Sequence, residues 1–190
     1  WGDGGDFYLP AGAQTLTWQM PEPNGEGATC WITNLKATPL QSISLGTAVG
    51  QPGLTWSASG MSGKSWGTDP TARAALATGN TTCSLTTTVQ GPGVLDFWIV
   101  GSAGDWRVLL NGSPYPLTFL NYGSEWEPIY INRGGPVTVT WVCDNPQPME
   151  PGPLPFGVQR VSWVPIPTTT LTEALDGSGL DWLRAQRAQG

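Results

Sequence analysis

Short segments in which polar and apolar residues alternate run through the chain and constrain its fold more than any other feature. The alternation is clearest over residues 14–20 and 137–142, where Thr, Val, Leu and Trp dominate. Successive side chains of a β-strand point to opposite faces of a sheet, so this pattern predicts half-buried strands. We expect further strands at residues 83–90, 93–100, 106–110, 116–120, 127–131 and 158–164.

Turns that contain glycine separate these segments, at residues 10–12, 91–93, 111–112 and 133–135. The Asn111-Gly112 pair predicts a tight hairpin, because both residue types tolerate the positive φ angles that such a turn requires. Many short strands joined by turns of this kind are typical of a sandwich or a barrel. The sequence therefore predicts an all-β fold.

The sequence also contains an internal repeat with an offset of 126 residues, which is 171 minus 45. Residues 45–56 match residues 171–182, and residues 8–18 match residues 130–141 with one gap. We interpret residues 45–170 as one complete β-sandwich repeat unit. Residues 1–44 would then be the C-terminal part of a preceding unit, and residues 171–190 the start of a following unit. We therefore expect the chain to be processed or to be a segment of a longer protein.

Four elements in order give the chain a family resemblance. They are the opening element at residues 171–182, the Val-Gln-Gly-Pro-Gly-Val-Leu-Asp-Phe-Trp strand at residues 89–98, the Leu-Pro-Ala-Gly hairpin at residues 9–18 and a final strand that contains Trp. This set resembles long tandem modules of bacterial surface and secreted proteins, which look like concanavalin-A-like or MAM-like jelly rolls. The resemblance covers most of the chain and implies an antiparallel jelly-roll-type β-sandwich with flanking partial repeat strands. It supplies no catalytic residues, and the proline-rich insertion at residues 145–155 departs from it.

Composition limits the location and the partners of the protein. Charged residues make up only 12% of the 190 residues, against roughly 25% in ordinary globular domains. Uncharged polar residues must therefore cover the surface, which favours an extracellular or cell-surface location. The net charge of −6, with no basic patch, argues against nucleic-acid binding. No apolar run approaches the roughly 18–20 residues of a transmembrane helix, so we expect no membrane insertion.

The residue types argue against an enzyme. Without any His, neither a Ser-His-Asp triad nor a Cys-His pair can form. A glycosidase needs two carboxyl groups about 5 to 9.5 Å apart across a cleft. Nothing in the sequence places its strand-associated acids in that way, and these are Asp96, Asp105, Glu125 and Glu127. We therefore predict no catalytic residues.

The three cysteines, Cys30, Cys83 and Cys143, fit no zinc-binding pattern. In an oxidising compartment they are candidates for one disulfide and one leftover thiol, and the sequence does not choose among the three pairings. Three buried free thiols are the alternative.

No cofactor is expected, with calcium as the alternative. Asp3 and Asp6 in a glycine-rich turn, or Asp176 with nearby carbonyl groups, offer the hard oxygen ligands that calcium prefers. Acidic glycine-rich turns are also common without a metal, so the sequence identifies candidate ligands rather than a site.

The 11 Trp residues have two interpretations. Trp18, Trp98 and Trp141 lie on alternating strands and are expected in the core or between sheets. Others lie near turns or strand ends and would stack on sugar rings if exposed. These candidate ligand-binding residues are Trp56, Trp66, Trp106 and Trp126. A buried structural role is the alternative for each of them.

The leading hypothesis from the sequence is a structural or adhesive module of an extracellular fibre or cell-surface repeat protein. Incomplete units leave strand edges without partners, and such edges pair with another chain or unit. The expected partners are neighbouring copies or repeat units, and head-to-tail contacts between them build filaments. The alternative hypothesis is a carbohydrate-binding module that binds glycans through surface Trp residues.

Overall fold

The computed structural model describes residues 37–66, 72–78, 81–101, 105–117, 128–144 and 156–169, together with residues 9, 13 and 15–17. This part of the chain forms nine strands and one short helix, and all the strand pairings are antiparallel. The predicted all-β class is confirmed. The elements are β1 (Gln41–Ser42), α1 (Leu45–Val49), β2 (Trp56–Ser59), β3 (Met61–Ser65), β4 (Arg73–Ala77), β5 (Cys83–Val100), β6 (Asp105–Leu110), β7 (Ser113–Tyr115), β8 (Ile129–Asp144) and β9 (Gly157–Pro165).

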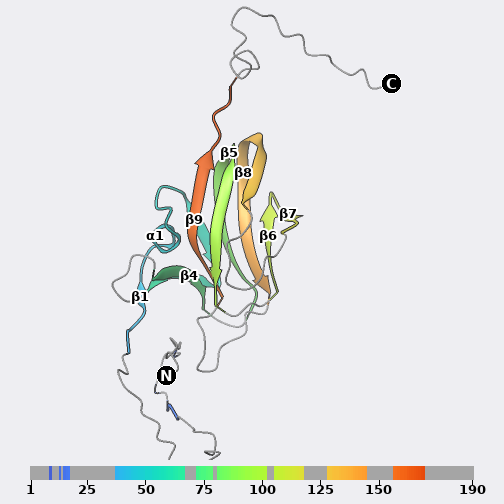
Figure 1. Cartoon of the computed structure of the whole chain (residues 1–190). Coiled ribbons are helices and arrows are strands. Elements are labelled where there is room, and N and C mark those ends of the chain that lie inside the picture. Colours follow the sequence, from blue (N-terminus) through green and yellow to red (C-terminus); the bar gives the residue numbers. More distant parts are fainter. Residues whose placement is uncertain are drawn as a thin grey trace, which may run out of the picture.

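Two long strands, β5 and β8, pair along most of their length at the centre of the fold (Figure 1). Their register runs from Cys83 opposite Cys143 to Gly91 opposite Gly135, and it resumes with Gly93 opposite Ile131. The three residues 132–134 of β8 therefore form a bulge where β5 has only Pro92. Bulges bend strands and increase their twist. At this bend β5 also changes its second neighbour, from β2 before the bulge to β9 after it.

The bend allows one hydrogen-bonded sheet to enclose a single core. The strand order is β1-β3-β4-β9-β5-β8-β6-β7, with β2 attached to the first half of β5. Leu85 and Trp141 on one side of the bulge belong to the same hydrophobic cluster as Leu95 and Ile129 on the other side. The arrangement is an antiparallel β-sandwich. The jelly-roll connectivity that the resemblance implies stays a prediction.

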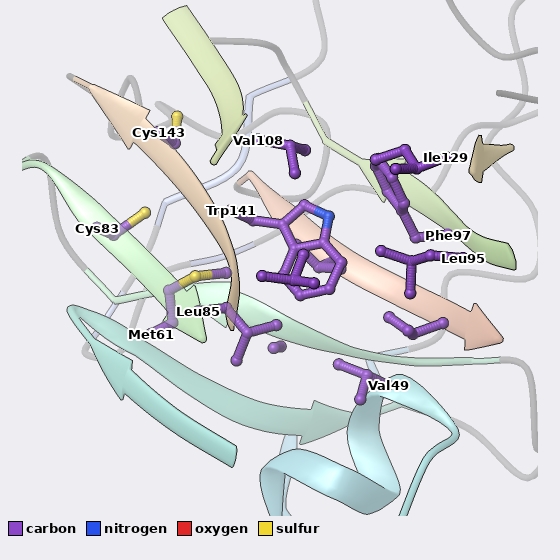
Figure 2. Close-up of a cluster of buried hydrophobic side chains, with 14 of the residues drawn as sticks. Val49, Met61, Cys83, Leu85, Leu95, Phe97, Val108, Ile129, Trp141 and Cys143 are labelled. Atoms are coloured by element: carbon purple, nitrogen blue, oxygen red, sulfur yellow. The ribbon is translucent and has the colours of Figure 1, made fainter. Parts of the chain in front are cut away.

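Trp141 lies at the centre of this core (Figure 2). Its side chain is fully buried, and its ring centroid lies 5.4 Å from that of Phe97 and 5.9 Å from that of Trp56. Aromatic pairs of this kind contribute about 0.5–1.5 kcal/mol beyond the burial of area. The predicted core position of Trp141 is confirmed. The same prediction is wrong for Trp98, which lies outside the core cluster because it alternates with the inward Phe97 along β5.

The helix α1 covers one side of the core, beside β3, β4 and β9. The Ser44 hydroxyl caps it by accepting a hydrogen bond from the Thr47 N–H at 3.2 Å. Gly50 ends it with a φ of 87°, a left-handed conformation that favours glycine. Ala48 and Val49 are buried, and Val49 joins the core cluster. No helix was expected from the sequence at this position, the start of the predicted repeat unit.

Most predicted strands and one predicted hairpin are confirmed. Segments 83–90, 93–100, 106–110, 137–142 and 158–164 lie within strands, and β8 begins at Ile129 within the segment predicted at 127–131. In the hairpin, Asn111 and Gly112 have φ angles of 50° and 80°, and Leu110 pairs with Ser113.

Two predicted turns are wrong. Residues 91–93 and 133–135 lie inside β5 and β8, where they form the irregularity at which the two strands bend. Of the strand predicted at 116–120, residues 116–117 belong to no strand, since β7 ends at Tyr115, and residues 118–120 lie outside the described residues. Residues 15–17 have no strand assignment, and the rest of the segment predicted at 14–20 lies outside the described residues.

The predicted flanking units lie largely outside the described residues. Of residues 1–44, the segment 41–42 forms β1, which pairs with β3 inside the central unit. Of residues 171–190 none is described. The sheet thus begins a few residues before the predicted start of the unit at residue 45.

The bulge gives a stability prediction. A Cβ atom at Gly91 would meet the Arg133 carbonyl oxygen, so Gly91→Ala should lower the free energy of unfolding by about 1–3 kcal/mol. A Cβ atom at Gly134, in the bulge on the partner strand, meets nothing within 4 Å. Gly134→Ala should therefore change stability by less than about 0.5 kcal/mol. Urea unfolding of both variants tests the pair, and equal losses would contradict this packing of the bulge.

Candidate functional site

The indole of Trp56, a candidate sugar-stacking ring, is held against the core. Its Nε1 donates a hydrogen bond to the Gln51 carbonyl oxygen at 2.9 Å. Its ring stacks on Trp141 with an interplanar angle of 29°. Pairing of β2 with β5 places the half-buried Trp56 opposite Thr87, which is buried. One face of the indole is therefore covered by a core residue, and the ring is not an exposed platform.

Trp106 has a similar position on β6. Its ring meets Phe97 edge-on at 6.2 Å and lies 6.3 Å from the ring of Phe156, measured between centroids. Trp66, which follows β3, is half-buried, and its backbone N–H donates to the Ala72 carbonyl oxygen at 2.8 Å. Trp126 lies outside the described residues. The structure thus brings Trp56 and Trp106 together around the core rather than on an exposed face.

An apolar strip crosses the outer face of the sheet, where β8, β5 and β9 lie side by side. Tyr130, Val94 and Val164 form one row, because Val94 pairs with both of the others. Ile166 lies next to this row, two residues after Val164 and beyond the end of β9, and its N–H donates to the Pro92 carbonyl oxygen at 2.9 Å. Tyr130, Val164 and Ile166 are 55%, 53% and 43% exposed. We call Val94, Tyr130, Val164 and Ile166 the outer strip.

The sequence analysis did not single out the outer strip, although a signal for it exists. Along β8, the buried Ile129 and Ile131 flank Tyr130, so apolar residues occupy both faces of the strand at this point. Alternation predicts a polar residue at the position of Tyr130 if that face is in contact with water alone. A large apolar residue at an outward position is therefore the feature that would have identified the strip.

Farther along β5, the same outer face carries Trp98 beneath an arginine. The guanidinium carbon of Arg160 lies 5.2 Å from the centroid of the Trp98 ring, a cation–π contact. Arg160 reaches this position from an irregularity in the β5–β9 register, where its φ is 49°. Asp96, exposed on the same face, lies between Trp98 and Val94 along the strand. The outer face therefore combines apolar, aromatic and charged groups on three adjacent strands.

Cys83 and Cys143 face each other where β5 begins and β8 ends. Both side chains are buried, and both belong to the core cluster (Figure 2). Burial raises the pKa of the Cys83 thiol above its ordinary value, and hydrogen bonds with Cys143 oppose that rise. Cys30, the third disulfide candidate, lies outside the described residues.

An exposed ion pair lies next to these thiols. The Asp144 carboxylate accepts hydrogen bonds from the Arg107 guanidinium and, at 3.1 Å, from the Thr82 hydroxyl. The hydrogen bond from Arg107 holds the pKa of the Asp144 carboxyl below its ordinary value. These contacts connect β6, β8 and the residue before β5 at one end of the sandwich.

The described residues offer no cluster of metal-binding side chains. They contain no group of three His, Cys, Asp or Glu side chains that could hold a metal ion. The calcium candidates Asp3, Asp6 and Asp176 lie outside them. The described residues that line an open depression beside Trp56 are Ser44, Leu45, Gly46, Pro52 and Leu54, and none of these carries a carboxylate. The same part of the chain has no helix that is long and apolar enough to cross a membrane.

Comparison of the chain with protein-family models, with curated proteins and with solved structures found no match in any of the three. The resemblance to bacterial surface modules therefore stays a prediction that depends on the four sequence elements alone. The function has to be argued from the surfaces that the fold exposes.

The positions of two Trp residues give a prediction that separates core from surface roles. Trp56→Ala removes a ring that stacks on Trp141, so it should lower the free energy of unfolding by about 3 kcal/mol. Trp98→Ala removes a half-buried ring from the outer face, so the loss should stay below about 1.5 kcal/mol. Urea unfolding measures both losses, and a smaller loss for Trp56→Ala than for Trp98→Ala would contradict these positions.

The ion pair at Asp144 predicts a pH dependence of stability. Because the pKa of this carboxyl is lower in the folded state, its contact with Arg107 stabilises the fold above the unfolded-state pKa. That contribution is lost as the pH falls through the folded-state pKa. Between about pH 5 and pH 2 the melting temperature of the native protein should approach that of Asp144→Asn.

Thermal melts at low salt would show this convergence. High salt should reduce the difference between the two proteins at neutral pH, because exposed ion pairs are screened. A difference in melting temperature that is constant from neutral pH to pH 2 would show that the pair contributes nothing through ionisation.

Proposed function

We propose that this chain is a structural or adhesive module of an extracellular fibre or cell-surface repeat protein, and that neighbouring units contact one another at the outer strip. The observation that carries the proposal is this row of apolar side chains across three strands, in which Tyr130 and Val164 are exposed and Val94 between them is half-buried. Contiguous apolar patches that are exposed on a folded domain often mark interaction sites.

The rest of the outer face provides the contrast. On the first half of β5 and the second half of β8, most outward positions carry polar side chains, among them Thr86, Thr88 and Thr140, while the outward Val142 is buried. The Thr86 hydroxyl donates to the Thr140 hydroxyl at 3.2 Å across the two strands. Such a surface is compatible with water and needs no protein partner. The outer strip is therefore a local departure from a polar sheet face.

A strand edge beside the outer strip supports contact between units. Only Gly157 and Val158 of β9 pair with β4, so among the described residues the later part of β9 has no strand on the side away from β5. Unpaired edges offer backbone hydrogen bonds to an added strand. Val164 belongs both to this edge strand and to the outer strip. A neighbouring unit could thus pair with the edge while its side chains cover the strip.

The position of the outer strip along the chain fits a repeat array. Ile166 directly follows β9, and the repeat predicts that a new unit starts at residue 171. The surface available for contact is therefore close in sequence to the junction with the next unit. An extracellular location belongs to the same proposal, which the low content of charged residues supports.

A carbohydrate-binding module is the second candidate. It is favoured by the presence of Tyr130, Trp98 and Asp96 on one outer face, since aromatic rings with adjacent polar groups suit sugar binding. The sugar-binding residues of this candidate differ from those predicted from the sequence, because Trp56 and Trp106 pack against the core.

The outer strip can be tested by self-association. We expect the purified chain to associate with rising concentration in sedimentation velocity, and Tyr130→Ala with Val164→Thr to weaken that association at least about tenfold. Thr138→Ala, on the polar part of the outer face, is the matched control and should associate normally. Both variants should keep their melting temperature within a few degrees, because Tyr130 and Val164 are exposed and Thr138 is a half-buried residue of the outer face.

Three outcomes decide between the candidates. Association that the strip variant weakens and the control does not would support the repeat-module proposal. A native chain that stays monomeric throughout, or a strip variant that associates normally, would overturn it. Glycan-array binding that both Tyr130→Ala and Trp98→Ala abolish would favour the carbohydrate-binding module instead.

A further inference from the structure

The facing cysteines at the end of β5 and β8 support an inference that is independent of the proposed function. Directly opposed residues in an antiparallel pair have Cα atoms about 4.5–5.5 Å apart. A disulfide requires a Cα separation of about 4.4–6.8 Å. Cys83 and Cys143 are such a pair, and both side chains enter the same core cluster, so they point to the same side of the sheet.

The strand register also favours one of the three disulfide pairings that the sequence left open. Nine consecutive residue pairs, from Cys83 opposite Cys143 to Gly91 opposite Gly135, fix the two thiols relative to each other. A bridge from Cys30 to either of them would leave the other as a single thiol in the core. We infer that Cys83 and Cys143 form a cross-strand disulfide under oxidising conditions, and that Cys30 keeps the remaining thiol.

The reaction can be written as thiol–disulfide exchange with a small disulfide oxidant. The thiolate of one cysteine attacks the oxidant, forms a mixed disulfide and releases one thiol molecule. The thiolate of the second cysteine then attacks the protein sulfur of the mixed disulfide and releases the second thiol molecule. Two protein thiols and one oxidant disulfide thus become one protein disulfide and two small thiols, with two electrons passing to the oxidant.

The surroundings of the pair determine when this reaction occurs. Burial disfavours the thiolate in the closed fold, since it raises the pKa of Cys83. However, Cys83 is the first residue of β5, and only Asp144 follows Cys143 in β8. Opening of these terminal pairs, or incomplete closure during folding, would admit an oxidant. After closure the core would shield the bridge from reductants.

The test uses the full chain with Cys30→Ser, incubated with oxidised glutathione and compared with the same protein under reducing conditions. Mass spectrometry of alkylated, digested protein should show one linked peptide pair that joins Cys83 to Cys143. The bridge closes a loop of 60 residues, 143 minus 83, and loops of this size predict a rise in melting temperature of roughly 10 °C.

Two controls make the result specific. The chain with Cys83→Ala and Cys143→Ala should have the same melting temperature in oxidant and reductant, which excludes a general effect of glutathione on the fold. The native chain, with all three cysteines, should give the same Cys83–Cys143 linkage and one free thiol. Linkage of Cys30 to either partner, or two alkylatable thiols and no rise in melting temperature in oxidised Cys30→Ser, would overturn the inference.

Discussion

The pairing of β5 with β8 is the interaction on which the rest of this structure depends. Each strand is long enough to belong to both halves of the sandwich, and the bulge opposite Pro92 lets both strands bend at the same place. Because of that bend, β2 and β9 occupy successive parts of the same strand without competing for its hydrogen bonds. The core around Trp141 and the facing cysteines are consequences of this one register.

The alternation of side chains along each strand places some aromatic residues in the core and others on the outer face. Phe97 points inward to contact Trp141, whereas its neighbour Trp98 points outward and lies under Arg160. Trp56 and Trp106 lie at the ends of shorter strands, yet pairing with β5 and β8 turns them toward the core. Proximity to a turn is therefore a poor guide to exposure in this fold. The outer strip, built around Tyr130, is the surface that remains for a partner.

Local patterns predicted much of the fold, and their failures have a common cause. Alternation located most strands, and the Asn111-Gly112 pair located the hairpin, because each depends on residues that are adjacent in sequence. Residues 91–93, with glycine and proline, and residues 133–135, with two glycines, have the composition of a turn. After a bulge the strand continues beside the same partner strand, whereas after a turn the chain reverses its direction. The residues of one segment do not show which partner strand lies beside it, so they do not distinguish the two.

The sequence by itself determined the all-β class, the positions of most strands and the hairpin at Asn111-Gly112. Tertiary structure alone decided that Cys83 faces Cys143 and that Tyr130, Val94 and Val164 form one row. Both arrangements depend on register between strands that are distant in sequence. A shift of one residue would turn each side chain to the opposite face, so the energy of the whole core, and not a local preference, selects the register.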